Sequence, residues 1–277
     1  MLGLYGKKDI KVDQKFFGFR MEIDKIYNED CLVGMKAIPD KSIDCIICDL
    51  PYGVLNRQNK SAQWDNIIPF EPLWEQYERV IKDNGAIVLF AQGMFTAQLM
   101  MSNPKIWRYN LIWDKVAPTG FLNANVAPLR SHEDISVFYK NAPSYHPQMV
   151  YAGWHKRNHG KGSMKGNPVN RCYGNFKDLP TTMSEEKFPT SIITIPKEHS
   201  VGKFFHPTQK PVELIRWLIR TYTNEGDLVL DNCMGSGTTA VACIKEKRHF
   251  IGYEITKEYF DIAQERIKQE QSQLTLF

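Results

Sequence analysis

The chain has 277 residues, a hydrophobic fraction of 43% and a charged fraction of 24%, which is ordinary for a soluble globular protein. This length permits one large domain or a domain with a substantial insert. The net charge of +4 indicates a nucleic-acid partner only weakly. No apolar stretch approaches the length of a membrane span, and the first 20 residues lack the apolar core and cleavage site of a signal peptide, so we expect a cytoplasmic protein.

Strand-like and helix-like segments alternate along the chain. Consecutive apolar residues, typical of strands covered on both faces, predict strands over 42–49, 85–92, 109–115, 134–140, 227–233 and 249–254. Helical periodicity occupies 69–85, 211–226 and 257–271. The first of these helices is expected to end at Asn84-Gly85, and the second to run from Pro211 to Gly226. This alternation predicts an α/β domain with a mainly parallel sheet.

The cysteines predict no metal site. The chain has six of them, and Cys45 and Cys48 form a C-x-x-C pair inside the first strand-like segment. A structural zinc site needs more ligands than this pair offers. We therefore expect buried, reduced thiols.

Residues 141–205 interrupt the α/β pattern and are rich in Gly, Pro, Asn and His. No Asp or Glu occurs between Asp134 and Asp178, although basic and aromatic residues interleave there. A basic, aromatic insert suits a polyanion that also offers flat bases, so we expect contact with nucleic acid. The alternative is a solvated, irregular insert.

The stretch "DLVLDNCMGSGTTAVACIKEKRHFIGYE" (227–254) has the pattern of a nucleoside-binding unit. Gly235 and Gly237 follow a strand that ends at Asp231, and they let the backbone approach a ligand. Glu254, at the end of the next strand, is placed for ribose hydroxyls. The pattern lacks a full G-x-G-x-x-G and a P-loop, so S-adenosylmethionine, which carries no phosphates, fits best. The alternative is a tight strand–helix joint without a ligand.

The stretch "DLPYG" (49–53) closes another strand of the same predicted sheet. Ligands of open α/β sheets bind outside the carboxyl ends of the strands, so both motifs face one crevice. If the glycine turn holds a methyl donor, "DLPYG" should hold the methyl acceptor.

Over about 21–262, the chain resembles the β-class DNA amino-methyltransferases, which methylate adenine N6 or cytosine N4. The order of "DLPYG", the basic insert and "DNCMGSGTT" (231–239) matches the circularly permuted order of that family. Further matches are "NEDC" (28–31), "WDK" (113–115), "RSHED" (130–134) and "HPTQKP" (206–211). The resemblance implies a Rossmann-like fold, S-adenosylmethionine as cofactor and double-stranded DNA as partner.

The resemblance also implies catalytic roles for Asp49, Leu50, Pro51 and Tyr52. The Asp49 carboxylate and the Leu50 carbonyl would accept the two N–H bonds of an exocyclic amino group, and Tyr52 would stack on a base flipped out of the duplex. Family members more often have proline where this chain has Leu50, but a backbone acceptor survives that change.

The residues that the resemblance assigns to the cofactor come from several motifs. Asp30 and Cys31 would meet its adenine and Glu254 its ribose, while Lys210 would pair with its methionine carboxylate. The full set is Asp30, Cys31, Asp49, His206, Thr208, Gln209, Lys210, Asp231, Gly235, Ser236, Gly237, Thr238 and Glu254. Trp113, Asp114 and Lys115 either support the base pocket or simply end a strand.

Asp49 at the first position of the acceptor motif favours adenine, since serine is the usual cytosine-N4 signal in this class. Cytosine-N4 transfer remains an alternative, as do a catalytically silent DNA-binding subunit and a protein or RNA methyltransferase. A cytosine-C5 mechanism needs a nucleophilic Cys beside Pro, and Cys48 lacks that neighbour.

We therefore expect an N-terminal extension (1–20), a first core part (21–140), a target-recognition insert (141–205), a second core part (206–265) and a C-terminal tail (266–277). "QLTLF" (273–277) resembles the peptide with which bacterial proteins dock on the sliding clamp. The alternative is a tail folded back on the core. The oligomeric state and the recognition sequence stay open.

Overall fold

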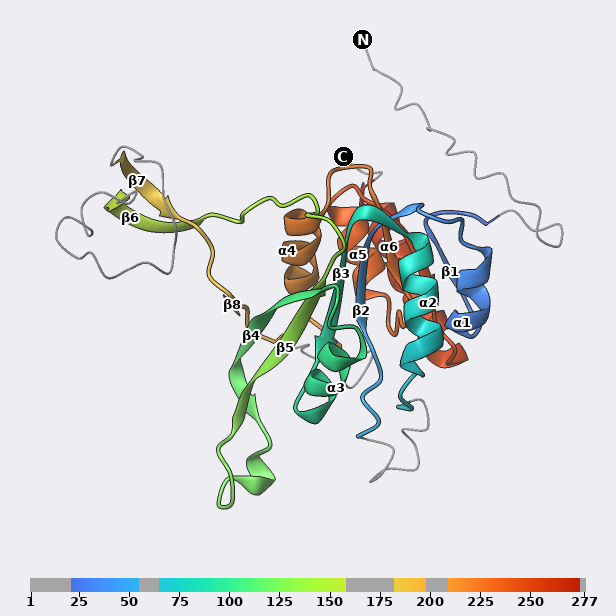
Figure 1. Cartoon of the computed structure of the whole chain (residues 1–277), viewed down its shortest axis with the longest axis horizontal. Helices are drawn as coiled ribbons and strands as arrows, with labels where there is room; N and C mark the ends of the chain where they lie inside the picture. The colour runs from blue at the N-terminus through green and yellow to red at the C-terminus, as the bar shows by residue number, and fades with distance from the viewer. Residues whose placement is uncertain (1–20, 55–64, 158–181, 198–208, 275–277) are drawn as a thin grey trace, which may run out of the picture. The chain divides into compact units, whose positions relative to one another are not determined.

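The computed structural model describes residues 21–54, 65–157, 182–197 and 209–274 (Figure 1). The strands are β1 (Lys25–Tyr27), β2 (Ile43–Asp49), β3 (Ile81–Ala91), β4 (Trp107–Thr119), β5 (Arg130–Phe138), β6 (Val150–Arg157), β7 (Thr182–Lys187), β8 (Ile192–Thr194), β9 (Leu228–Asp231) and β10 (His249–Tyr253). The α-helices are α1 (Cys31–Gly34), α2 (Phe70–Val80), α3 (Met94–Ser102), α4 (Val212–Tyr222), α5 (Thr238–Lys245) and α6 (Lys257–Leu274), with short 3₁₀ turns at Met35–Ala37 and Phe121–Asn123.

One sheet of eight strands organises this part of the chain, in the order β1-β10-β9-β2-β3-β5-β4-β8 (Figure 1). The strands from β1 to β3 in that order are parallel, β5 is antiparallel to both β3 and β4, and β8 is parallel to β4. The predicted α/β fold with a mainly parallel sheet is thereby confirmed.

The two motifs that lie far apart in the sequence occupy neighbouring strands. In the register of β2 against β9, Cys45 pairs with Val229 and Ile46 with Leu230. Their parallel direction brings the carboxyl ends of both strands to the same edge of the sheet. Asp49 and Asp231, the last residues of β2 and β9, therefore face one crevice, as the permuted motif order predicts.

Helices cover both faces of the sheet, because its central strands are apolar on both faces. Cys45 and Ile47 of β2 join a core with residues of α4, α5 and α6. Ile46 and Cys48 point the other way and join a second core with residues of α1, α2 and α3. Each fully buried aliphatic side chain contributes about 1.5–3 kcal/mol, which fixes the register of β2 and hence the place of Asp49.

Two predicted helix ends were wrong. Helix α2 ends at Val80 rather than at Asn84-Gly85, because Ile81 is extended and pairs with Ile43 of β2. Residues 82–85 are then taken up by a register shift between β2 and β3. Helix α4 begins after Pro211 as predicted but ends at Tyr222, where the next residue is extended. In both places, pairing or burial of the following segment prevails over the glycine signal.

The predicted insert contains a small unit of its own. Residues Pro147–Thr190 form a separate compact unit, in which β6 and β7 pair as an antiparallel ribbon. Strand β8, which also fell inside the expected 141–205 range, belongs to the main sheet beside β4. Residues 158–181, with Lys161, Lys165, Arg171 and Lys177, lie outside the described residues.

The last helix extends into the range expected for the tail. Helix α6 continues to Leu274; Ile267 is buried and Glu270 pairs with Lys245 of α5 at 2.6 Å. Residues 275–277, with most of the apolar end of "QLTLF", and residues 1–20 lie outside the described residues. Within the described part of the chain, no helix is long and apolar enough to cross a membrane.

Candidate active site

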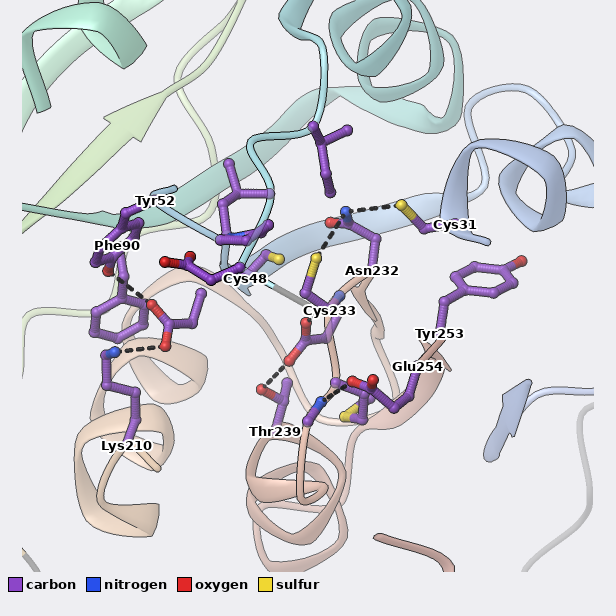
Figure 2. A pocket seen from close by; sticks show the side chains of 18 of the residues that line it. Cys31, Cys48, Tyr52, Phe90, Lys210, Asn232, Cys233, Thr239, Tyr253 and Glu254 are labelled. Carbon is purple, nitrogen blue, oxygen red and sulfur yellow. Dashed lines mark hydrogen bonds and ion pairs between the residues drawn. The ribbon is translucent and has the colours of Figure 1, made fainter. Parts of the chain in front are cut away.

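A cavity of about 1040 Å³ opens at the carboxyl edge of the parallel strands (Figure 2). Residues from the ends of β2, β3, β9 and β10, and from the segments that follow them, line it. Thirteen of the predicted site residues are among them: Asp30, Cys31, Asp49, Leu50, Pro51, Tyr52, Gln209, Lys210, Asp231, Gly235, Ser236, Thr238 and Glu254. His206 and Thr208 lie outside the described residues, and Gly237 is not part of the lining.

The end of β9 carries a buried carboxylate, Asp231, that is held by neutral donors. Its two oxygens accept hydrogen bonds from the Thr239 hydroxyl at 2.6 Å (Figure 2) and from the Cys233 backbone N–H at 3.0 Å. Burial raises the pKa of Asp231 to about 6, and these hydrogen bonds only partly offset it. The carboxylate is therefore ionised at neutral pH.

The turn after β9 is tied to the end of β10. The Glu254 carboxylate accepts hydrogen bonds from the backbone N–H of Gly235 at 2.8 Å and of Thr256 at 2.7 Å. Gly235 has a φ of +54°, and a side chain there would meet open space, which suits close approach of a ligand. Gly237 has a different reason to be glycine: at a φ of +83°, an added Cβ would lie 2.9 Å from the Ala263 Cβ of α6.

Helix α1 forms the next part of the rim. Asp30 is its N-cap, with a carboxylate oxygen that accepts the Leu32 N–H at 2.7 Å. The Asn232 side-chain amide donates to the sulfurs of Cys31 and Cys233 at 3.5 and 3.6 Å (Figure 2). Sequence analysis did not single out Asn232, although it lies between two predicted motif residues.

The acceptor motif is shaped by its own turn and by Asp65. Asp65 is buried, and its two carboxylate oxygens accept the backbone N–H of Gly53 at 3.0 Å and of Val54 at 2.8 Å. Gly53 has a φ of +69°, which favours glycine. The Tyr52 ring packs against Phe95 of α3, with ring centroids 4.9 Å apart. Asp65 has no sequence signal, since it lies 12 residues from Gly53 in the sequence and meets this turn only in three dimensions.

Both oxygens of Asp49 have partners in the structure. The Tyr52 hydroxyl donates to Oδ1 at 2.7 Å, and the Lys210 ammonium donates to Oδ2 at 2.5 Å (Figure 2). Burial raises the pKa of Asp49, and the Lys210 charge only partly offsets that rise. Each carboxylate oxygen still has a second lone pair for a substrate N–H.

Two further side chains extend this pairing: Glu133, which sequence analysis did not assign to the site, and Lys115, for which it left a supporting role at the base pocket open. Glu133 of β5 contacts Lys210 at 3.3 Å and Lys115 of β4 at 3.2 Å. Burial alone would raise the pKa of Glu133, but the two ammonium groups hold it below its ordinary value. Burial alone would lower the pKa of Lys210, but Asp49 and Glu133 hold it above its ordinary value. Glu133 and Lys210 thus stabilise the charged forms of one another.

The residues of the "HPTQKP" and "WDK" motifs contact different parts of the structure. Gln209 accepts the Ser236 hydroxyl at 3.0 Å, which links its segment to the glycine turn. The Lys210 ammonium lies with the acceptor carboxylates, so its predicted pairing with a methionine carboxylate stays a prediction. Trp113 is buried in the cavity wall, whereas Asp114 accepts the Val116 N–H in a local turn.

The lining has features that fit S-adenosylmethionine. Asp231, Glu254 and the open side of Gly235 lie together at the ends of β9 and β10. The cations among the lining residues, Arg130, Lys197 and Lys210, come from other segments. A carboxylate-rich surface suits a cationic sulfonium nucleoside better than the pyrophosphate of a dinucleotide.

Comparison with known proteins agrees with this geometry. The model of a DNA methylase family, named for N6 and N4 methyltransferases, matches residues 43–265. Type II methyltransferase M.BglII from Bacillus subtilis is 28% identical over 88% of this chain and 69% of its own length. Type II methyltransferase M1.MboII from Moraxella bovis is 26% identical over 88% of this chain and 96% of its own length.

Solved structures show the same fold. The M1.HpyAVI–SAM complex is 25% identical with a TM-score of 0.57, over 88% of this chain and 98% of that one. The PvuII cytosine-N4-specific DNA methyltransferase is 16% identical with a TM-score of 0.62, over 89% of each chain. Since the family match spans most of the chain, this protein belongs to the β-class DNA amino-methyltransferases and uses S-adenosylmethionine as its cofactor.

Proposed function

We propose that the protein transfers a methyl group to the N6 amino group of an adenine flipped out of duplex DNA. The observation that carries this proposal is the Asp49 carboxylate, which lines the cavity at the end of β2 and has spare acceptor capacity. Aspartate at this position favours adenine over cytosine in the family that the chain belongs to.

An exocyclic amino group is a poor nucleophile, because its lone pair is delocalised into the ring. Acceptors on both N–H bonds turn that lone pair toward an electrophile, and we assign these roles to the Asp49 carboxylate and the Leu50 carbonyl. Pro51 fixes the turn between Leu50 and Tyr52, and the Tyr52 ring, backed by Phe95, offers a face to the flipped base. S-adenosylmethionine supplies the electrophilic methyl group when bound.

The cofactor roles remain proposals, residue by residue. Asp30 and Cys31 would border its adenine and Glu254 its ribose, at the rim that α1 and the end of β10 build. Asp231, Gly235 and Ser236 would line the methionine side, where the ionised Asp231 attracts a cationic ligand. Gln209 is held against Ser236 and is placed to border the same region.

Cytosine N4 is the second candidate, since the cytosine-N4-specific PvuII enzyme shares the fold. Its amino group would need the same two acceptors. The intact cavity and acceptor motif speak against a catalytically silent subunit.

Partners beyond DNA are also proposals. The segment 141–205, with its small β6–β7 unit, would read the DNA sequence. Residues Gln273–Phe277 would dock on a bacterial sliding clamp. The test is to delete 273–277 and measure clamp binding; unchanged binding would reject this proposal. Because its substrate would be DNA, we place the protein in the cytoplasm. It would act there as a monomer or as a homodimer.

The product nucleoside tests the proposal. Duplex DNA is incubated with the protein and isotopically labelled S-adenosylmethionine, digested to nucleosides and separated by chromatography. We expect the label in N6-methyladenine. Label in N4-methylcytosine would show that cytosine N4, and not adenine N6, is the acceptor. Label in neither product would reject both candidate functions.

A further inference from the structure

Four buried or largely buried charged side chains meet at the acceptor side of the cavity. This ion network consists of Asp49, Lys115, Glu133 and Lys210, and each comes from a different sequence motif. Its two carboxylates and two ammonium groups balance, which is how buried charges are tolerated. The Lys210 ammonium sits between both carboxylates, and the Lys115 ammonium contacts Glu133.

Lys210 is shared unequally between the two carboxylates. Its Nζ lies 2.5 Å from Asp49 Oδ2 and 3.3 Å from Glu133 Oε2. Among the described residues, Glu133 Oε2 is the buried side-chain oxygen that accepts no hydrogen bond. A buried acceptor whose nearest donor forms no hydrogen bond with it costs free energy, so Glu133 competes with Asp49 for the Lys210 ammonium.

We infer that Glu133 is a positioning residue for methyl transfer: its carboxylate shares the charge of the Lys210 ammonium with Asp49, so that Asp49 stays ionised but able to accept a substrate N–H. The inference rests on the proposed role of Asp49 as that acceptor.

The sharing matters because either extreme weakens Asp49. Without a cation nearby, burial would favour the protonated carboxyl group, which loses acceptor capacity. With the cation held by Asp49 alone, the carboxylate would be tightly paired and a poorer acceptor for a neutral N–H. Lys115 sets the balance, since it occupies the other oxygen of Glu133.

Other titratable groups also face this network. They are Tyr52 and Cys48 near Asp49 itself, Asp231 at the end of β9, Lys197 after β8, and Arg130 at the start of β5. A test must therefore change the sharing of Lys210 in two opposite directions and follow the plateau rate as well as the acid limb, because a general change of charge moves the acid limb alone.

Glu133→Gln and Lys115→Met supply those two directions in single-turnover methyl transfer at saturating cofactor and DNA. Glu133→Gln leaves Lys210 to Asp49, so the plateau rate falls about tenfold or more and the acid limb of the pH profile moves to lower pH. Lys115→Met leaves Glu133 with Lys210 alone, so the acid limb moves to higher pH.

Glu246→Gln is a matched control outside the cavity lining. The Glu246 side chain is 11% exposed and holds Arg216 and Arg220, while the Glu133 side chain is 12% exposed and holds two lysines. Both substitutions remove a carboxylate from two cations. We expect Glu246→Gln to lower the melting temperature without moving the acid limb.

Shifts of the same sign in both network variants, no shift in Glu133→Gln, or a wild-type plateau rate in Glu133→Gln would overturn the inference. If Glu133→Gln does not fold, Lys115→Met decides alone, and an acid limb at or below that of the wild type overturns it. The proposed function fails separately, if Asp49→Ala still transfers methyl groups at the wild-type rate.

A second, independent observation concerns the hairpin of β4 and β5. At the carboxyl end of β3, Ala91 pairs with Asp134 of β5. Along β4, Asp114 pairs with His132, so residues 115–130 extend beyond the carboxyl edge at which Asp49 lies (Figure 1). Arg130, where β5 begins, lines the cavity. DNA that presents a base to Asp49 must approach this edge.

The tip of the hairpin is apolar and exposed. Phe121, Leu122 and Val126 are 76%, 86% and 82% exposed. No Asp or Glu lies between Lys115 and Arg130. Such side chains cannot bind phosphates, but they fit the faces of stacked bases, and apolar wedges between base steps are a known way to unstack a duplex. We propose that this tip enters the base stack of the substrate duplex beside the target base and supports its extrusion.

The test combines Phe121→Ala and Leu122→Ala, with Met101→Ala as the control. Met101 is 73% exposed and lies near the end of α3, away from its start at the carboxyl edge. On a matched duplex, the double variant should lose about tenfold or more in kcat/KM and most of the fluorescence rise of 2-aminopurine at the target position. A duplex with an abasic site opposite the target, where the pair is already absent, should restore its transfer rate.

An unchanged rate, or an equal loss on both duplexes, would overturn this proposal. The alternative is that a second copy of the chain packs on the tip, and size-exclusion chromatography of wild type and double variant tests for it. A wild-type dimer that the double variant dissociates would assign the tip to a protein interface instead.

Discussion

The two sides of the cavity hold their carboxylates in different ways. At the ends of β9 and β10, Asp231 and Glu254 accept hydrogen bonds from a hydroxyl and from backbone N–H groups. At the end of β2, Asp49 is held by the Lys210 ammonium and a tyrosine hydroxyl. In the roles proposed above, neutral hydrogen-bond donors leave the negative charge of Asp231 and Glu254 available to a cationic methyl donor, whereas a lysine keeps the buried Asp49 ionised beside a neutral base.

The largest effect should follow from removing the cation of the acceptor side. Lys210→Met leaves Asp49 and Glu133 close together with Lys115 as the remaining network cation, which raises the pKa of Asp49 further. We expect methyl transfer at neutral pH to fall by about a hundredfold or more and to recover partly at alkaline pH, where Asp49 ionises. Single-turnover rates from pH 6 to 10 measure this. A variant with full neutral activity would contradict the role given to Lys210.

The two glycines of the donor turn should fail differently. Gly237→Ala places a Cβ 2.9 Å from the Ala263 Cβ at a φ of +83°, so we expect a loss of about 1–3 kcal/mol in unfolding free energy. Gly235→Ala meets open space, so strain of about 1 kcal/mol and weaker cofactor binding are expected. Chemical denaturation and calorimetric titration separate the two. Equal effects of both variants on cofactor binding would contradict the distinction.

Asp231 makes the donor side sensitive to pH. Its pKa is raised to about 6, so it gains a proton as the pH falls through 6 and loses its attraction for a cationic cofactor. Affinity for S-adenosylmethionine should fall by up to about tenfold per pH unit below that point. Stability changes in the opposite direction: because the folded state binds this proton more tightly than the unfolded state, Asp231 makes the unliganded protein more stable as pH falls from 7 to 5. Titrations over this range that show constant affinity would argue against this role.

The smallest expected effect comes from a substitution at helix α1, on the rim of the cavity. Asp30→Ala removes the N-cap of α1, which should cost about 1 kcal/mol in unfolding free energy and weaken cofactor binding only a few fold. Asp30→Asn, which can still cap, is the control and should retain most of that stability.

The difference between the two sides of the cavity also explains how much of the site the sequence could predict. The side of the cavity proposed for the methyl donor is built within one βαβ segment, where Asp231, Gly235 and Glu254 follow one another at fixed spacing. The order of motifs also predicted that β2 and β9 share an edge, which the sheet confirms. Glu133 lay in a quoted motif without an assigned role, and Lys115 had a base-pocket role only as one of two alternatives. Their partners come from β4, β5 and the segment before α4, which lie far apart in the sequence.

Other features had no local signal at all. Asp65 contacts the acceptor turn from 12 residues beyond Gly53, and β6 and β7 lie in a segment without clear periodicity. The end of α2 was wrong because strand pairing of Ile81 outweighed the Asn84-Gly85 signal. Local patterns thus predicted elements and motif spacing, whereas long-range ion pairs and turn contacts required the fold.

Asp49→Asn gives the most direct test of the division between the two sides. Cofactor affinity is measured by calorimetry and methyl transfer to duplex DNA by single-turnover kinetics, on the same preparation of wild type and variant. We expect affinity for S-adenosylmethionine to stay within a few fold of the wild type, and N6-methyladenine formation to fall by about a hundredfold or more. Wild-type transfer by Asp49→Asn, or an equal loss of binding and transfer, would contradict the role of Asp49 as the amino-group acceptor.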